Sequence, residues 1–186
     1  QIARDVHEIK KDYNLIVRGL SSSMKVNSEN DGMSLDDILT ILKSSLDASL
    51  PKGKRLSFNI QLEENLYTQN HYLLLSIFRN LFNNAIEATN GNLVELSVRQ
   101  SSTDSSYVIE VEDHGPGIDP EDMEQIFEPG FSTKINYETG EVNRGLGLSL
   151  VKDFIEFRLG GTIRVTSVPG KTVFTLTIPK EKWSGL

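Results

Sequence analysis

The sequence contains no cysteine, a single tryptophan and fewer basic than acidic residues. Without cysteine, disulfide frameworks, thiolate metal sites and cysteine nucleophiles are excluded. Lys and Arg number 19 against 26 Asp and Glu, a formal net charge of −7, which argues against general nucleic-acid binding because that needs a basic face. No apolar run approaches the roughly 18 residues that a membrane-spanning helix needs, and no signal peptide is visible.

The chain has 186 residues, enough for one medium-sized domain or for one domain with a small appendage. With 38% hydrophobic and 24% charged residues, it is neither a disordered tail nor a fibre. It begins with Gln1 rather than Met, which suggests a fragment of a longer protein. We expect any sensory or membrane part to lie upstream.

Two amphipathic helices are predicted in the first 50 residues. Between residues 1 and 20, apolar residues recur at steps of three and four and form one stripe. After a polar turn, Ser34 is typical of a helix start and Pro51 of a helix end. We therefore predict a helical hairpin over residues 1–52. Its apolar stripes need a partner, either each other with a second copy of the chain or the following domain.

From residue 53 onward the pattern predicts an α+β domain over residues 53–186, with one sheet covered by helices. Pro169 and Gly170 are a hairpin signal between the last two strands. Alternating or β-rich segments predict strands at 55–62, 93–100, 107–113, 162–168 and 172–179, and helical segments lie at 69–89 and 146–159.

Two asparagines continue the apolar face of the predicted helix 69–89. Leu73, Ile77, Asn80 and Asn84 follow at steps of four, three and four, so they share one face. A buried carboxamide without hydrogen-bond partners costs ~1–3 kcal/mol. Two interpretations stay open: satisfied core or capping asparagines, or a neutral oxygen ligand for a hydrated Mg²⁺ that carries phosphates.

A second motif, Asp113-x-Gly115-x-Gly117, follows directly on a predicted strand. It can be a simple turn. Alternatively, the carboxylate accepts a hydrogen bond from the exocyclic amine of adenine, and it would repel the carbonyl oxygen of guanine at the same place. The two glycines would let the backbone approach the flat base because they have no Cβ.

A third motif, with Gly145 and Gly147, opens the predicted helix 146–159. It is either an ordinary glycine-rich helix start or an anion site made of free N–H groups. The preceding loop, residues 127–143, is long and polar, as expected of a mobile lid. Lys134 and Arg144 are cationic candidates for binding phosphates.

In this order, the three motifs resemble the N box and the glycine boxes of the histidine-kinase ATP-binding domain. Phe127 and Phe131 resemble its F box. The family belongs to a superfamily with gyrase, heat-shock chaperone ATPases and mismatch-repair ATPases. The resemblance covers about residues 55–180 and implies a two-layer α/β sandwich, a mixed sheet covered by helices, that binds ATP and Mg²⁺.

The resemblance also implies roles for individual residues. Asn84 resembles the Mg²⁺ ligand, Asn80 its neighbour at the phosphates, Asp113 the adenine anchor with Gly115 and Gly117 beside it, Gly145 and Gly147 the second glycine box, and Thr172 the threonine that closes the site. Two positions depart from the family pattern. Glu87 stands where many members carry Lys, and Lys171 stands where a second glycine is common.

The reaction depends on the second substrate. Gyrase and chaperone relatives place a Glu four residues before the metal Asn, as a base for water; here that residue is Asn80, which cannot take a proton. This favours transfer over hydrolysis. His7, followed by Glu8, resembles the phosphoacceptor box of histidine kinases, with Glu8 as the general base. Alternatively, His7 is a surface histidine on a charged helix.

The sequence therefore predicts a sensor histidine kinase core that binds Mg-ATP and autophosphorylates His7. The phosphoryl group would pass to an aspartate of a response regulator. We expect a homodimer, no nucleic-acid partner, and a cytoplasmic catalytic part joined to a membrane only through upstream segments. The alternatives are a serine kinase of the anti-sigma-factor kind and a non-catalytic nucleotide-binding scaffold.

Overall fold

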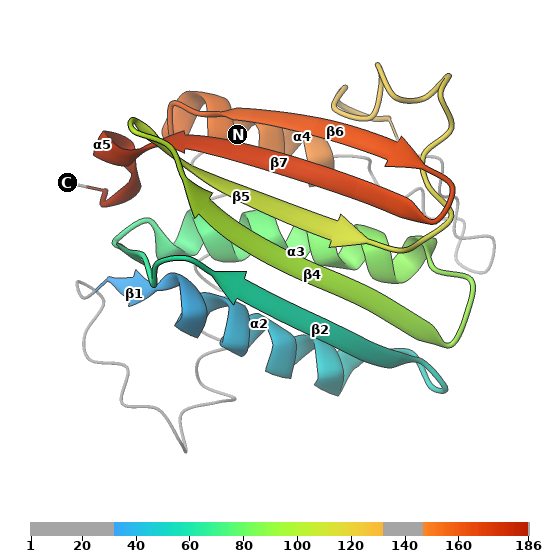
Figure 1. Ribbon diagram of the computed structural model, residues 1–186. Helices are drawn as coiled ribbons and strands as arrows, with labels where there is room; N and C mark the ends of the chain where they lie inside the picture. The colour runs from blue at the N-terminus through green and yellow to red at the C-terminus, as the bar shows by residue number, and fades with distance from the viewer. Residues whose placement is uncertain (1–31, 132–146, 186) are drawn as a thin grey trace.

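The computed structural model describes residues 32–131 and 147–185, and Figure 1 shows a twisted sheet with helices packed on one of its faces. In chain order, the elements are β1 (Met33–Ser34), α2 (Leu35–Ser49), β2 (Arg55–Leu62), β3 (Tyr67–Thr68), α3 (His71–Ala88), β4 (Leu93–Ser102), β5 (Ser106–Asp113), α4 (Gly147–Asp153), the π-helix η1 (Phe154–Arg158), β6 (Thr162–Val168), β7 (Lys171–Pro179) and α5 (Lys180–Trp183).

The main sheet has five strands in the order β2-β4-β5-β7-β6, and β1 and β3 form a separate two-stranded ladder. β2 runs parallel to β4, whereas the other neighbouring pairs of the main sheet are antiparallel. The sheet is therefore mixed, as the sequence predicts. The predicted strands agree with the structure to within two residues at either end.

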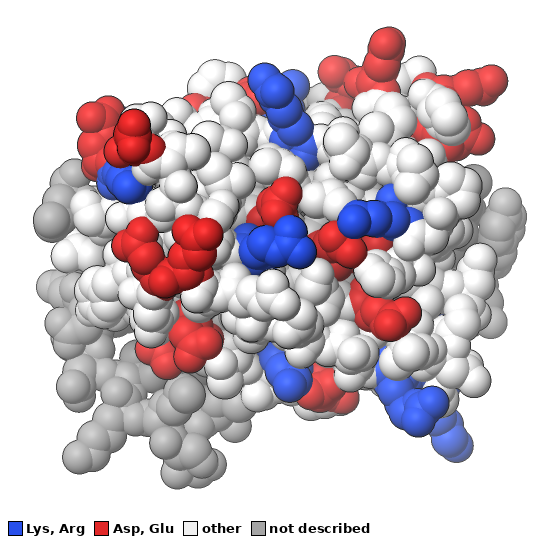
Figure 2. Space-filling model, viewed as in Figure 1, with Lys and Arg blue, Asp and Glu red and all other residues white. Residues whose placement is uncertain are grey.

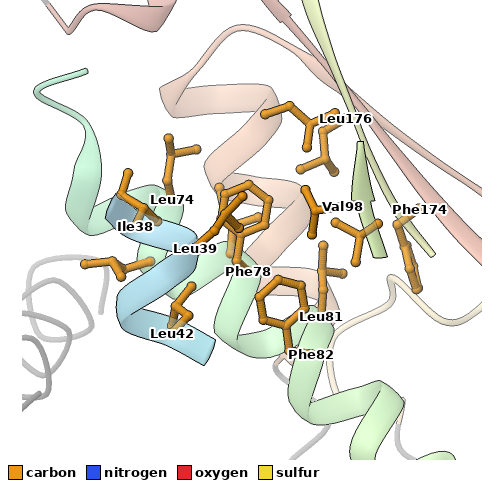
Figure 3. Close-up of a cluster of buried hydrophobic side chains, with 14 of the residues drawn as sticks. Ile38, Leu39, Leu42, Leu74, Phe78, Leu81, Phe82, Val98, Phe174 and Leu176 are labelled. Carbon is orange, nitrogen blue, oxygen red and sulfur yellow. The ribbon is translucent and has the colours of Figure 1, made fainter. Parts of the chain in front are cut away.

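The core lies between the sheet and its helices. On α3, Leu74, Phe78 and Phe82 are buried at helical spacing, and Figure 3 shows them in one cluster with Val98 of β4. The rings of Phe78 and Phe82 stack with their centroids 5.9 Å apart. Each such side chain stabilises the fold by about 1.5–3 kcal/mol relative to leaving it in water. This packing determines which face of α3 is turned away from the core and can contribute to a binding site.

Helix α2 belongs to the same core as α3 and the sheet, although it lies before the predicted domain boundary at residue 52. Its N-cap is Ser34, whose Oγ accepts a hydrogen bond from the Asp37 N–H at 3.1 Å. Its buried stripe packs on α3 and β2, and Figure 3 shows Ile38 and Leu42 pointing into the core. The apolar stripe of α2 therefore packs on the following domain, which is one of the two partners that the sequence left open. The predicted helix over residues 1–20 lies outside the described residues.

One helix differs from the expectation. The predicted helix 146–159 is a short α-helix, α4, continued by η1, and the Leu159 N–H donates to the Phe154 carbonyl oxygen at 3.0 Å, a five-residue step. His71 starts α3 but is buried, and this burial lowers its pKa. Among the described residues, no helix is long and apolar enough to span a bilayer.

Candidate functional site

A row of three polar side chains closes one end of the sheet on its helix-facing side. Thr172 of β7 pairs with Asp113 of β5 on one side and with Ser167 of β6 on the other. Side chains two residues apart on a strand share a face, so the next two rows inward are apolar: Val111, Phe174 and Val165, then Ile109, Leu176 and Ile163. The change from apolar to polar marks where the core ends and a candidate site begins.

Asp113 is the charged member of this polar row. Its Oδ1 accepts a hydrogen bond from the Gly115 N–H at 2.9 Å. Burial nevertheless raises the pKa of the Asp113 carboxyl, because it outweighs the lowering effect of that bond. A carboxylate that is partly shielded from water is stabilised by a ligand that donates a further hydrogen bond to it. An exocyclic amine is such a donor.

The β6–β7 hairpin holds the Asp113-x-Gly115-x-Gly117 loop in place. The Gly170 N–H donates to the Gly115 carbonyl oxygen at 3.0 Å, and the Ile118 N–H donates to Ser167 Oγ at 2.8 Å. Gly117 has a φ of +87°, and a Cβ there would lie 2.7 Å from the Val168 carbonyl oxygen. Only glycine fits this conformation and this approach.

The asparagines of α3 lie half-buried on its other flank. The Asn80 Nδ2 donates to the Ser76 carbonyl oxygen at 2.8 Å, so its amide nitrogen is satisfied. A Cβ added to Gly147 would lie 3.0 Å from Asn80 Oδ1, which places this oxygen at the first residue of α4. Within the described residues, the Asn84 side chain makes no hydrogen bond. No described residue therefore competes with a ligand for its carboxamide oxygen.

The C-terminal end of α3 brings these asparagines toward the Asp113 loop. Thr89, the C-cap of α3, has its Oγ1 3.8 Å from where a Cβ of Gly115 would stand. Asn84 precedes Thr89 by five residues, roughly 7.5 Å along the helix axis. The helix that carries Asn84 thus ends beside the Asp113 loop. The Lys54 ammonium donates to the carbonyl oxygens of Ile86 at 2.8 Å and Thr89 at 2.5 Å and holds this helix end.

No cluster of three or more His, Asp or Glu in the described part of the chain could by itself hold a metal ion. A carboxamide oxygen such as that of Asn84 suits Mg²⁺, which usually keeps several waters and takes its remaining ligands from substrate phosphates. The donor set therefore fits a metal that arrives with a nucleotide.

The opposite, uncovered face of the sheet carries charges of both signs, which Figure 2 shows interspersed over its surface. His114 Nε2 and Glu112 Oε1 are 2.8 Å apart, and Lys171 Nζ lies 3.3 Å from Glu112 Oε2. The hydrogen bond with His114 and, after it, the contact with Lys171 lower the pKa of Glu112. Lys171, which stands where the family often has glycine, thus forms an ion pair on the face of the sheet away from Asp113.

The F-box phenylalanines are partly buried at the edge of the core. The Phe127 ring meets Phe174 edge to face with centroids 6.4 Å apart, and Lys152 Nζ lies 5.9 Å from the Phe127 centroid. Phe131 packs against the same core. Glu87, the other departure, is exposed on α3.

The structure places Asn80 beside Gly147, with Asn84 about one turn further along α3. It brings Asp113, Gly115, Gly117 and Thr172 together at the glycine loop and the sheet end. The other predicted site residues, His7, Glu8, Lys134, Arg144 and Gly145, lie outside the described residues. Sequence reasoning missed Ser167 and Thr89. For Ser167 a signal existed, since a hairpin turning at Pro169-Gly170 places residue 167 opposite residue 172.

A mixed sheet covered on one face by helices, with paired asparagines beside an Asp-x-Gly-x-Gly loop, defines an ATPase domain of the histidine-kinase type. Residues 70–182 match the family model described as histidine kinase-, DNA gyrase B- and HSP90-like ATPase, and the chain belongs to this family. The predicted resemblance and fold class are confirmed.

Individual relatives agree with this assignment. The chain is 32% identical to sensor histidine kinase GlnK of Bacillus subtilis (strain 168) over 181 residues, which is 96% of this chain but 43% of GlnK. It is 40% identical over 126 residues to sensor protein CitS of Halalkalibacterium halodurans, covering 66% of this chain and 22% of CitS. A nucleotide-free structure of the catalytic domain of histidine kinase ThkA superposes with a TM-score of 0.66 at 26% identity, covering 80% of this chain and 96% of that domain. The chain thus spans less than half of GlnK and CitS.

Proposed function

We propose that the chain is the catalytic core of a sensor histidine kinase that moves the γ-phosphoryl group of Mg-ATP to His7. The observation that carries the nucleotide part is the partly buried Asp113 carboxylate, which lies between the apolar rows of the sheet and the glycine loop and has a raised pKa. Family membership and the names of GlnK, CitS and ThkA support the kinase part.

Asp113 would anchor the base by accepting a hydrogen bond from the exocyclic amine of adenine. Guanine carries a carbonyl oxygen at that position, and two acceptors would repel each other. Gly115 and Gly117 would let the loop backbone lie against the flat base, and Thr172, beside Asp113 in the polar row, would close the site. The lowered polarity around Asp113 strengthens such a charged hydrogen bond.

The phosphates would lie between α3 and the start of α4. Asn84 would offer its carboxamide oxygen to Mg²⁺, with Asn80 next to it at the phosphates. Gly145 and Gly147 would present backbone N–H groups, and Lys134 and Arg144 would add positive charge. When bound, Mg²⁺ neutralises charge that develops on the transferring phosphoryl group.

Transfer would follow an in-line displacement. A neutral ring nitrogen of His7 forms the bond to the γ-phosphorus, the bond from this phosphorus to the β–γ bridging oxygen breaks, and ADP leaves with that electron pair. Glu8 takes or orients the proton on the other ring nitrogen. Asn80 stands where a hydrolysing relative would hold its base and cannot take a proton, which favours transfer over hydrolysis.

The phosphohistidine would supply an aspartate of a response regulator, and we propose a homodimer as the active assembly. With α2 in the ATPase core, a dimerising segment would have to be built from residues before β1. We also propose that this part works on the cytoplasmic side of a membrane-anchored sensor, and the name of GlnK as a sensor histidine kinase supports the sensor part of this proposal.

The test is incubation of the full chain with labelled Mg-ATP, followed by mapping of the modified residue by mass spectrometry. Acid-labile, base-stable phosphate on His7 is expected, and His7→Gln should abolish it with ATP affinity nearly unchanged. Label on the His7→Gln variant would move the acceptor elsewhere. Acid-stable phosphate on a separate protein would favour the serine-kinase alternative, and ATP binding without any transfer would favour the scaffold.

A further inference from the structure

Ser167 joins two parts of the site that the proposed function uses, yet it has no part in that function so far. Its Oγ accepts the hydrogen bond from the Ile118 N–H at 2.8 Å, which ties down the glycine loop. The same oxygen lies 2.7 Å from Thr172 Oγ1, and either hydroxyl can be the donor between them. Thr172 is only 4% exposed, so water does not compete freely for its hydroxyl.

Hydrogen counting leaves two directions for this pair, because each hydroxyl oxygen can accept two hydrogen bonds and either hydroxyl can be the donor. A serine hydroxyl has one hydrogen to donate, and the Ser167 oxygen already accepts from Ile118. Thr172 Oγ1 is the one hydrogen-bond partner recorded in the described residues that can take the Ser167 hydrogen. If Ser167 donates, then Thr172 must send its own hydrogen elsewhere. Asp113 and the space beside it lie on the other side of Thr172 in the same row.

We propose that Ser167 is a positioning residue for purine recognition, because it holds the Thr172 hydroxyl as a donor toward the base beside Asp113. The inference rests on the proposed adenine site. Two ring nitrogens, N1 and N7, flank the exocyclic amine of adenine, and both are acceptors. With the amine on Asp113, a neighbouring hydroxyl fixed as a donor matches one of these nitrogens.

A purely structural role for Ser167 predicts a different result. In that case its loss would loosen the glycine loop and lower the affinity for every purine nucleotide by the same factor. A positioning role ties its effect to one atom of the base. Nucleotides that lack that atom separate the two possibilities, and 1-deaza-ATP and 7-deaza-ATP each replace one ring nitrogen by a C–H group and keep the amine.

The experiment measures dissociation constants by calorimetry for ATP, 1-deaza-ATP and 7-deaza-ATP with the full chain and Mg²⁺ present. In the wild type, one of the two analogues should bind about five-fold more weakly than ATP, the loss of one neutral hydrogen bond. In Ser167→Ala, the affinity for ATP should fall while the affinity for that analogue changes little. The ratio of the two dissociation constants should therefore drop below about two-fold.

Two further variants serve as controls. Ser167→Thr keeps a hydroxyl and should restore the wild-type ratio. Thr166→Ala removes the exposed neighbouring hydroxyl on the other face of β6 and should leave the ratio unchanged. If Ser167→Ala does not fold, Ser167→Cys replaces it, because a thiol is a weak donor and should also reduce the ratio.

The outcomes are distinguishable from those for the proposed function. A wild type that binds no ATP would remove the nucleotide site and this inference with it. A wild type that binds ATP but discriminates against neither analogue, or a ratio that is the same in wild type and Ser167→Ala, would overturn the role of Ser167 alone.

Discussion

The Lys54 ammonium caps the C-terminal end of α3 by donating to the carbonyl oxygen of Thr89, and it reaches the Ile86 carbonyl oxygen as well. The last carbonyl groups of a helix have no partner within the helix, and a cation there also favours the negative end of the helix dipole. Lys54 precedes β2, so one side chain joins the start of the edge strand to the helix end nearest Asp113.

We therefore expect Lys54→Met to lower the free energy of unfolding by about 1–2 kcal/mol, since two charge-assisted hydrogen bonds are lost while the apolar stem remains. Urea denaturation measures this. Lys52→Met removes the same charge from an exposed position nearby and should change the free energy of unfolding by less than about 0.5 kcal/mol. Equal effects of the two substitutions would argue against the cap.

Asp113→Asn should weaken ATP binding by about 1.5–3 kcal/mol, or roughly 10- to 150-fold, because a charged acceptor becomes neutral and its amide nitrogen can face the base amine. Calorimetry with Mg-ATP measures the change. Glu110→Gln removes one carboxylate from the outer face of the same strand and serves as the matched control. An unchanged ATP affinity in Asp113→Asn would refute the adenine role.

The same substitution should stabilise the protein without nucleotide. Burial raises the pKa of Asp113, so at neutral pH the folded state holds an ionised carboxylate less readily than the unfolded chain does. This unfavourable contribution is present above the raised pKa and disappears as the pH falls to the ordinary Asp value of about 3.9. Asp113→Asn should therefore be more stable than wild type at pH 7, with the difference vanishing in acid. Thermal melts across pH measure it, and a less stable Asn variant at pH 7 would contradict the account.

Asn84→Asp should change the Mg²⁺ dependence of ATP binding. A carboxylate holds the metal more tightly than a carboxamide does but repels the phosphates when the metal is scarce, so the midpoint of an Mg²⁺ titration should shift. Asn59→Asp adds the same charge at an exposed position on β2 and controls for net charge. Superimposable titrations of Asn84→Asp and wild type would count against Asn84 as a ligand.

Gly117→Ala tests the close approach between the glycine loop and the β6–β7 hairpin. Both Gly117 and Gly170 have positive φ, +87° and +88°, but a Cβ on Gly117 meets the Val168 carbonyl oxygen whereas one on Gly170 meets nothing within 4 Å. Gly170→Ala should cost about 1–2 kcal/mol for its backbone conformation. Gly117→Ala should lower the free energy of unfolding by more than this. It should also lower the affinity for ATP, because the loop must move. Denaturation curves that coincide for the two variants would mean that the contact is unimportant.

Much of the fold could be predicted because the strands of the main sheet alternate and the long helices α2 and α3 each carry a stripe at helical spacing. β2 and β6 have the predicted bounds, and Asn80 and Asn84 lie on a half-buried side of α3 as the spacing indicates. The partner of an amphipathic stripe is a different matter. The apolar face of α2 fits a second helix or a sheet edge equally well, and the sequence could not decide between them.

The polar row shows where local patterns stop being sufficient. The pairing of Ser167 with Thr172 follows from a two-residue turn and was within reach of the sequence. The pairing of Asp113 with Thr172 joins strands about sixty residues apart and depends on strand order, which no local pattern encodes. Asp113 could be singled out as an anchor, whereas its neighbours could not.

The position of α2 decides how this domain can be cut from its chain. Figure 1 shows α2 lying alongside α3, and α2 and β2 both precede residue 70, where the family match starts. A fragment begun there would leave the side of α3 that faces α2 bare and the outer edge of β4 without its parallel neighbour. Among the described residues, the core reaches back to Met33, so a fragment made for crystallisation or nucleotide titration should start no later than Met33.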